Sequence, residues 1–218
     1  MRKLSFLLFI TLFTTTIMSA QKEMSKQDSI SYSVGVMLAN NLKQQGLDEV
    51  NLDMVMAGLK DAVADAEKID KKAAANMLNQ FVRERQERIT KENIAKGEAF
   101  LAENAQKEGV KTLESGLQYL VLTEGQGAIP TAQDRVEVHY HGTLIDGTVF
   151  DSSVERGKPA TFGVTQVIKG WVEALQLMPA GSKWRLFIPS DLAYGNRGTG
   201  GIPPNSVLIF DVELLDIK

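Results

Sequence analysis

The fold of this chain is decided by six short sequence blocks between Val136 and Ile217. In chain order, the blocks are Val138-His-Tyr-His-Gly142, Phe150-Asp-Ser-Ser153, Val167-Ile-Lys-Gly-Trp171, Ala193-Tyr-Gly195, Ile202-Pro-Pro204 and Phe210-Asp-Val-Glu-Leu-Leu215. Several of them alternate apolar with polar residues, as strands do when one face is buried. The stretch therefore predicts one compact β-rich domain with an aromatic pocket.

Alternation also predicts where the strands of this domain lie. Val136, Val138 and Tyr140 alternate with polar neighbours, which is typical of a half-buried strand. The same pattern predicts further strands near residues 115–122, 184–188 and 208–214. Asp146-Gly147 predicts a two-residue hairpin loop that returns the chain to Phe150.

A short helix completes the predicted domain. Val167, Ile168, Trp171 and Leu175 recur at helical spacing, which predicts a short amphipathic helix. An antiparallel sheet that packs one short helix against its inner face is an α+β arrangement. We therefore predict an α+β domain over residues 109–218, preceded by helices.

Residues 21–69 are predicted to form an all-helical module. A first apolar stripe consists of Ile30, Val34, Met37, Leu38 and Leu42. A second stripe consists of Leu52, Val55, Met56, Leu59 and Val63. Gly46 is a candidate stop for the first helix, and Asn51 is a candidate N-cap for the second. Because two isolated helices make a poor core, we predict that this module pairs with a second copy.

Residues 70–108 are predicted to form one long linker helix. Its first part carries apolar residues, whereas its middle, Arg83-Glu-Arg-Gln-Glu-Arg88 followed by Lys91, Glu92 and Asn93, is almost all polar. At a rise of about 1.5 Å per residue, this helix would be on the order of 55 Å long. A helix that is polar on all sides is a solvent-exposed rod between domains. Gly97 is predicted to soften or bend it.

Residues 1–20 have the pattern of a secretory signal peptide. Arg2 and Lys3 precede a short apolar run, and Ala20 is a small residue before the expected cleavage point. The alternative is an uncleaved anchor, although the run is at the short limit for crossing a membrane and is rich in threonine. We predict export to the periplasm without a stable membrane span, and association with the outer membrane stays open.

The composition excludes several classes of function. Of the 218 residues, 44% are hydrophobic and 23% are charged, which is typical of a globular protein. The net charge is −3 and no basic block occurs, so nothing indicates binding to nucleic acid. The chain contains no cysteine, which excludes disulfides, thiolate catalysis and lipid attachment through cysteine.

The sequence lacks the familiar catalytic constellations. His139 and His141 are the only histidines, and they share one strand face without further ligands nearby in sequence. We therefore predict a structural role for both and no metal site. Gly198-Thr-Gly-Gly201 lacks the lysine and the spacing of a phosphate-binding loop. No serine lies in a Gly-x-Ser-x-Gly elbow, so hydrolase and phosphoryl-transfer functions have no support.

What remains is a set of aromatic and aliphatic side chains. Its members are Tyr140, Phe150, Val167, Ile168, Trp171, Tyr194, Ile202 and Phe210. Composition alone favours a core role for all of them. Val138, Phe162, Leu186 and Val212 are assigned to the core without further function.

Taken together, the six blocks resemble the FKBP-type peptidyl-prolyl cis/trans isomerases in order, spacing and residue type over roughly the last hundred positions. The resemblance implies a bent sheet wrapped around a short helix, with a proline-binding pocket between them. Tyr32-Ser-Val-Gly35 and Asn41-Leu-Lys-Gln-Gln-Gly46 are similar to the dimerisation module of the macrophage-infectivity-potentiator-like branch. Members of that branch are exported homodimers.

The resemblance implies non-covalent catalysis without a cofactor. The indole of Trp171 would form the floor under the proline ring. The walls would come from Tyr140, Phe150 and Phe210. The substrate-binding rim would come from Val167, Ile168 and Ile202. The Tyr194 hydroxyl would hydrogen-bond a substrate carbonyl. Asp151, oriented by Tyr140 and paired with Arg156, would present an oxygen to the twisting carbonyl.

The implied partners are unfolded or partly folded proteins with Xaa-Pro bonds, a second copy of this chain, and macrolide inhibitors such as rapamycin. Ala160 stands where eukaryotic single-domain members have a pocket phenylalanine, and the segment from Phe162 to Val167 is shorter. Tight macrolide binding is therefore not implied.

The implied function is to assist the folding of exported proteins. The alternative is a periplasmic holdase chaperone in which isomerisation is incidental.

Overall fold

The computed structural model describes residues 24–47 and 49–218. The predicted signal peptide and its anchor alternative, residues 1–20, lie outside the described residues. The chain divides into two units, residues 1–69 and 70–218, and each unit is described by itself. Within the described ranges, no helix combines the length and the apolar character needed to cross a membrane.

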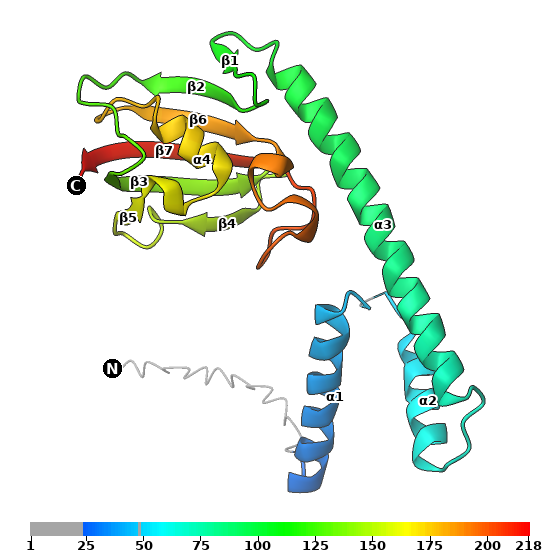
Figure 1. Cartoon of the computed structure of the whole chain (residues 1–218). Coiled ribbons are helices and arrows are strands. Elements are labelled where there is room, and N and C mark those ends of the chain that lie inside the picture. Colours follow the sequence, from blue (N-terminus) through cyan, green and yellow to red (C-terminus); the bar gives the residue numbers. More distant parts are fainter. Residues whose placement is uncertain (1–23, 48) are drawn as a thin grey trace, which may run out of the picture. The chain divides into compact units, whose positions relative to one another are not determined.

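The first unit contains two helices, α1 (Lys26–Gln44) and α2 (Leu52–Val63) (Figure 1). The side chain of Asn51 accepts a hydrogen bond from the N–H of Met54 at 3.1 Å, which caps α2. Gly46 adopts a left-handed φ of 69° just after α1, a common way to end a helix. The predicted N-cap and the predicted stop are both confirmed.

Neither α1 nor α2 contains a buried residue. Most of the predicted stripe residues, and some apolar neighbours, are exposed: Ile30, Tyr32, Val34, Met37, Leu52, Met54, Met56, Leu59 and Val63. A single copy of this unit therefore leaves much of the apolar surface of both helices uncovered.

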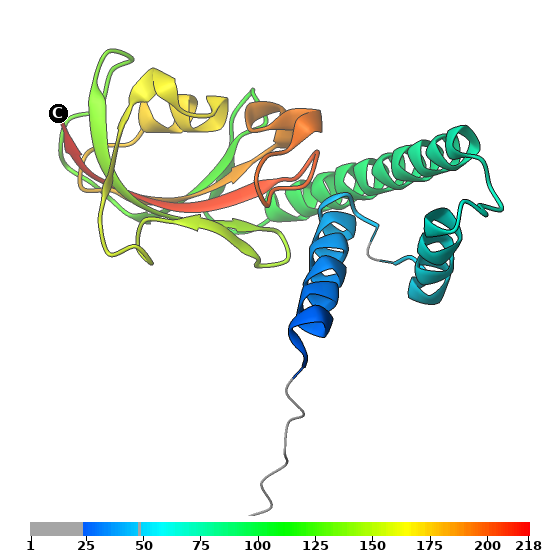
Figure 2. The ribbon, with the colours of Figure 1, turned by 90° about the horizontal axis from the view of Figure 1, so that it is seen from below.

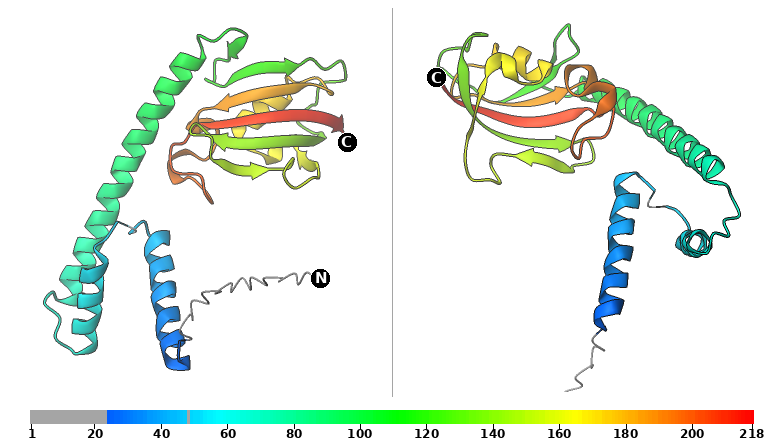
Figure 3. Two further views of the ribbon diagram at one scale, coloured as in Figure 1. Left: turned by 180° about the vertical axis from the view of Figure 1, so that it is seen from behind. Right: turned by 60° about the horizontal axis from the view of Figure 1, so that its bottom comes forward.

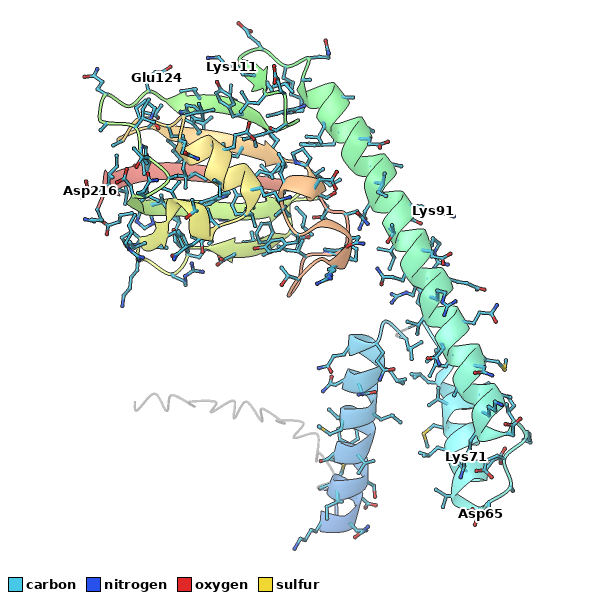
Figure 4. The ribbon with its side chains drawn as sticks, viewed as in Figure 1. Asp65, Lys71, Lys91, Lys111, Glu124 and Asp216 are labelled. Carbon is cyan, nitrogen blue, oxygen red and sulfur yellow. The ribbon has the colours of Figure 1, made fainter. Side chains whose placement is uncertain are left out.

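The second unit begins with α3 (Lys71–Asn104), a continuous helix of 34 residues. The Asp70 carboxylate caps it by accepting from the backbone N–H groups of the second and third residues of the helix, at 2.9 and 3.0 Å. At 1.5 Å per residue its length is about 51 Å. Lys91, in its middle part, is exposed (Figure 4). The helix ends four residues before the predicted position 108, at Asn104, which is buried and donates a hydrogen bond to Gln118.

The C-terminal turns of α3, beyond the polar middle part of the helix, pack on the sheet. Gly97 is buried, and the helix continues through it. A Cβ at this position would lie 2.9 Å from Cγ2 of Val207, so the glycine permits a close approach of the helix. One turn further on, the rings of Phe100 and Phe187 pack with their centroids 6.0 Å apart.

The rest of this unit is a seven-stranded antiparallel sheet with the order β1-β2-β6-β7-β3-β4, and β5 pairs with β3. The strands are β1 (Val110–Thr112), β2 (Gln118–Thr123), β3 (Arg135–Leu144), β4 (Val149–Ser152), β5 (Ala160–Gly163), β6 (Lys183–Ile188) and β7 (Leu208–Ile217). The strands predicted from alternation are β2, β3, β6 and β7. Alternation missed β1 and β5, because three or four residues are too few to show a period.

The hairpin between β3 and β4 is confirmed, but its loop is longer than predicted. The N–H of Leu144 donates to the carbonyl of Thr148 at 2.9 Å, which leaves three residues between them. Gly147, the last of the three, has a left-handed φ of 86°. The carboxylate of Asp146 accepts from the N–H of Thr148 at 2.9 Å. This is a three-residue loop that ends in a left-handed glycine.

The sheet curves around one short helix, α4 (Lys169–Leu175) (Figures 2 and 3). Val167 and Ile168 precede the helix instead of forming its first turn, and Ile168 occupies the N-cap position. Three short 3₁₀ turns, Val164–Gln166, Ser190–Leu192 and Gly195–Arg197, carry the chain between the larger elements. The α+β class is confirmed.

Candidate active site

A cavity of about 550 Å³ lies between the concave face of the sheet, α4 and the segment that precedes β7. Its lining is mostly aromatic or aliphatic: Tyr140, Phe150, Asp151, Phe162, Gln166, Val167, Ile168, Trp171, Tyr194, Thr199, Gly200, Ile202 and Phe210. All predicted site residues line this cavity except Arg156, which contacts two of the lining residues.

Strand pairing and helix position bring these side chains together. Tyr140 lies on β3 and Phe210 on the adjacent strand β7, and each is buried on the concave side with the core. Phe150 and Asp151 come from β4, on the other side of β3. Trp171 lies on the buried face of α4, one helical turn before Ala174 and Leu175. Residues distant in sequence therefore line one cavity.

Trp171 is the centre of a cluster of edge-to-face rings. Its ring centroid lies 5.5 Å from that of Tyr140 and 5.3 Å from that of Phe210, with interplanar angles of 86° and 79°. Phe150 packs against Phe210 at 5.3 Å and 84°. Aromatic pairs prefer this arrangement, because the positive edge of one ring meets the negative face of the other. Packed rings hold the cavity walls in place before any substrate enters.

Gly142, the last residue of the first sequence block, leaves space for two aromatic rings of the cavity. A Cβ at this position would lie 2.8 Å from ring atoms of both Phe150 and Phe210. Real Cβ atoms do not approach aromatic carbons so closely, so a side chain here would displace two cavity walls. The absence of a side chain on β3 thus makes room for the rings of the two neighbouring strands.

The position of Phe162 adds to the role that the sequence predicts for it. The sequence predicts only a core role for this residue; it packs against the core, as predicted, and also lines the cavity from β5. Its ring lies 5.9 Å from Trp171 and 6.1 Å from Tyr140, centroid to centroid. Gln166, Thr199 and Gly200 also line the cavity and were missed. They lie in short turns and loops, where no periodic pattern reveals the direction of a side chain.

The charged group of the cavity is held by two neighbours. The Tyr140 hydroxyl donates to Oδ2 of Asp151 at 2.5 Å. The Arg156 guanidinium donates to Oδ1 of the same carboxylate and, at 2.7 Å, to the Tyr140 hydroxyl. Its Cζ also lies 5.5 Å from the centre of the Tyr140 ring. The predicted contacts of Asp151 are therefore present, while its role in catalysis stays a prediction.

Two family models match the chain, one at each end. Residues 127–215 match the model described as "FKBP-type peptidyl-prolyl cis-trans isomerase". Residues 27–121 match the "domain amino terminal to FKBP-type peptidyl-prolyl isomerase". The chain belongs to the FKBP-type peptidyl-prolyl cis-trans isomerases. It is accordingly an enzyme of this isomerase class.

Relatives match over most of their length. The chain is 49% identical to "Outer membrane protein MIP" of Legionella longbeachae, with 88% of this chain and 86% of the relative covered. It is 48% identical to the FKBP-type 22 kDa peptidyl-prolyl cis-trans isomerase of Escherichia coli strain K12, with 86% and 93% covered. The crystal structure of FkpA from Escherichia coli matches with a TM-score of 0.72 and 40% identity, covering 88% of this chain and 94% of that one.

The electrostatics of this isomerase pocket favour an ionised Asp151 beside a protonated Tyr140. Burial raises the pKa of Asp151, but the hydrogen bonds from Tyr140 and Arg156 outweigh it and hold the pKa below its ordinary 3.8. Burial, together with the bond to Asp151, raises the pKa of Tyr140 above its ordinary 10.0. At neutral pH, the pocket therefore presents a carboxylate whose position is fixed by two donors.

The two histidines lie outside the cavity lining, on β3. Nδ1 of His139 lies 3.1 Å from the hydroxyl oxygen of Ser153, and Nδ1 of His141 lies 3.1 Å from that of Ser152. Among residues 24–47 and 49–218, no group of three or more histidine, aspartate or glutamate side chains could hold a metal ion. These contacts tie β3 to the end of β4 and support the predicted structural role.

Proposed function

We propose that this aromatic cavity carries out the isomerisation and that its substrates are Xaa-Pro bonds of unfolded or partly folded exported proteins. The observation that carries this proposal is a single carboxylate, held by two donors, at an otherwise mostly apolar cavity. No covalent chemistry is required of such a site. The proposal follows from the physical nature of the barrier.

Rotation about an Xaa-Pro bond is slow because amide resonance must be broken. The barrier is about 20 kcal/mol, and the tertiary amide before proline makes the cis and trans forms similar in energy. A twisted amide is less polar than a planar one. An apolar cavity that removes water from the substrate carbonyl therefore stabilises the transition state relative to the ground state.

The apolar side chains supply this environment. The indole of Trp171, which is only 4% exposed, forms the floor on which the proline ring rests. Tyr140, Phe150 and Phe210 form the walls. The rim is formed by Val167, Ile168 and Ile202. Ile168 is at the N-cap position of α4, where a backbone N–H has no partner within the helix and can donate to a substrate carbonyl.

Two polar groups orient the bond that twists. Asp151 presents a carboxylate oxygen to the carbonyl carbon of the rotating amide, and Arg156 and Tyr140 hold that carboxylate in place. The hydroxyl of Tyr194, a residue that is 41% exposed at the cavity edge, donates to another substrate carbonyl and holds the peptide in a turn. Both groups act by position and charge.

The test is acceleration of cis/trans isomerisation of a short Xaa-Pro peptide by residues 21–218. Asp151→Ala and Tyr194→Phe should each lower kcat/KM, the first by at least about tenfold, with the fold intact by circular dichroism. Glu155→Ala is the matched control, because it removes an exposed carboxylate from the turn that follows β4, four residues after Asp151, and should change little. Unchanged turnover in both pocket variants would refute this assignment of the site.

We further propose that residues 21–69 form a dimerisation module, 70–108 a linker segment built on α3, and 109–218 the isomerase domain. The exposed apolar surface of α1 and α2 supports pairing with a second copy. Two pockets in one dimer could then bind one client at two places, which raises the effective concentration. The signal-peptide pattern of residues 1–20 supports delivery to the periplasm.

The exposed apolar residues of α1 and α2 also favour a second candidate function, a holdase chaperone. Such a surface can hold an unfolded client without isomerising it. The intact Asp151→Ala variant separates the two functions. If it prevents aggregation of an unfolded client as well as the parent does but no longer speeds refolding limited by proline isomerisation, both activities are present. If the parent does not suppress aggregation, the holdase proposal fails.

A further inference from the structure

Part of the cavity wall is built by a loop that leaves the sheet before β7. Thr199, Gly200 and Ile202 of this segment line the cavity, and Tyr194 lies just before it. Ile202 is the buried member, at 7% exposure. A small internal bridge, in which the backbone groups of Thr199 and Ile202 bond to each other, keeps the loop narrow. At the base, the N–H of Asn205 donates to the carbonyl of Gly195 at 2.8 Å.

A side chain on α3 holds this loop from outside the cavity. Nδ2 of Asn93 donates to the carbonyl of Pro204 at 2.8 Å, across 111 positions of sequence. One helical turn further on, Gly97 lets the helix approach Val207, which is 4% exposed. These two contacts join the last residues of the loop to a helix whose end is held to β2 by the hydrogen bond from Asn104 to Gln118.

The chain between the anchor and the cavity wall is stiff. Pro203 and Pro204 each have a fixed φ, and a residue before proline is restricted in turn, which applies to both Ile202 and Pro203. Fixing the carbonyl of Pro204 therefore also limits where Ile202 can lie. Beside the hydrogen bond, a cavity of about 370 Å³ extends between Asn93, the β3–β4 loop and Pro203. Side chains do not fill this space beside Pro203, so the hydrogen bond from Asn93 is a direct link between α3 and this end of the loop.

We propose that Asn93 is a positioning residue of the isomerase: by holding Pro204 from α3, it keeps Ile202 in place as one wall of the proline pocket. The inference rests on the proposed function of the cavity. It assigns to the helix before the isomerase domain a part in substrate binding. It does not require Asn93 to touch the substrate.

The test compares steady-state kinetics of the parent with Asn93→Ala and Asn93→Asp in the full mature chain. Asp has nearly the same shape as Asn, but its carboxylate cannot donate to the Pro204 carbonyl. Because Ile202 contacts bound substrate in the ground and transition states alike, KM should rise about three- to tenfold while kcat stays within about twofold. Hydrogen exchange of residues 195–207 should become faster. Asn93→Gln, which retains an amide donor, should restore part of the loss.

Gln80→Ala is the matched control on the same helix, because its amide donates to Glu84, one turn along the helix, and not to the loop before β7. It should leave KM and hydrogen exchange unchanged. A rise in KM of the same size in this control, or unchanged KM in both Asn93→Ala and Asn93→Asp, would overturn the inference.

A double-mutant comparison separates failure of the inference from failure of the proposed pocket. If Asn93 acts through Ile202, Asn93→Ala should have little further effect in an Ile202→Ala background. If Ile202→Ala alone does not change KM, the pocket assignment itself is wrong. If Ile202→Ala raises KM but the Asn93 substitutions add the same factor with or without it, the two residues act independently and the inference is wrong.

Discussion

The helices of the first unit and the sheet of the second differ in how they treat apolar side chains. Leu59 on α2 is 44% exposed and Met37 on α1 is 70% exposed, whereas Leu186 and Val212 in the sheet are fully buried. The sheet domain closes its core within one chain, because α4 covers its concave face. It also has apolar side chains such as Phe187 on the opposite face, which α3 covers. The first two helices have no comparable cover within their own unit.

This difference shows that the apolar residues of strands and the apolar stripes of short helices are buried by different kinds of surface. Strand residues find theirs on neighbouring strands and on α4, so their burial is complete in the monomer. Helical stripes on short helices cannot bury one another well, so they require another surface. The predictions below use matched substitutions in the two regions to break or sharpen this contrast.

The largest effect is expected on association of the chain with a second copy. Leu59→Asp places a charge in the apolar stripe of α2 and should weaken dimerisation at least about a thousandfold, since a symmetric dimer carries the change twice. Light scattering should then give the mass of a monomer, while activity on a short peptide changes less than about twofold. Lys60→Asp places the same carboxylate at the next, polar position, with an even larger change in net charge, and should remain dimeric. A monomeric parent would show that the stripe serves another purpose.

The next effect concerns the core of the sheet. Leu186→Ala removes a fully buried side chain and should lower the free energy of unfolding by about 3 kcal/mol. Both tryptophans, Trp171 and Trp184, lie in this core, so their fluorescence during urea unfolding reports on the isomerase domain alone. Leu59→Ala should leave that transition unchanged. A shared shift would mean that the two units unfold together.

A smaller effect is expected at two glycines in helices. Gly97→Ala should destabilise the isomerase domain by about 1 kcal/mol, because the new Cβ meets Cγ2 of Val207, a stiff side chain. Gly58→Ala in α2 meets no atom within 4 Å in the single chain and should not shift the tryptophan transition. In a solvent-exposed helix, Gly→Ala normally stabilises by up to about 1 kcal/mol. A gain at Gly97 would therefore mean that α3 is not docked at Val207.

The smallest effect is expected from pH. Because the pKa of Asp151 lies below 3.8 and that of Tyr140 above 10.0, kcat/KM should stay constant between about pH 5 and pH 9. The lowered pKa of Asp151 adds stability that is present above the unfolded-state pKa and is lost as pH falls through the folded-state pKa. The difference in Tm between parent and Asp151→Asn should thus shrink below pH 3.8. A loss of activity between pH 5 and 7 would contradict this assignment.

The sequence by itself determined the elements that depend on neighbours along the chain. Alternation located β2, β3, β6 and β7, and the caps at Asn51 and Gly46 follow from side chains and glycines acting within a few residues. The spacing of six blocks was enough to identify the family and most of the cavity lining. Local patterns can do this because they record which face of each element is buried.

Only the tertiary structure decided which distant residues meet. Phe162 lines the cavity because β5 pairs with β3, and four residues are too few to show which way they face. The close approach of Gly97 to Val207 also depends on how α3 packs, and the spacing of residues along the helix does not reveal it. The bond from Asn93 to Pro204 joins positions 111 residues apart, and no periodicity carries that information. Such contacts depend on how whole elements pack, so they become visible only when the chain is folded.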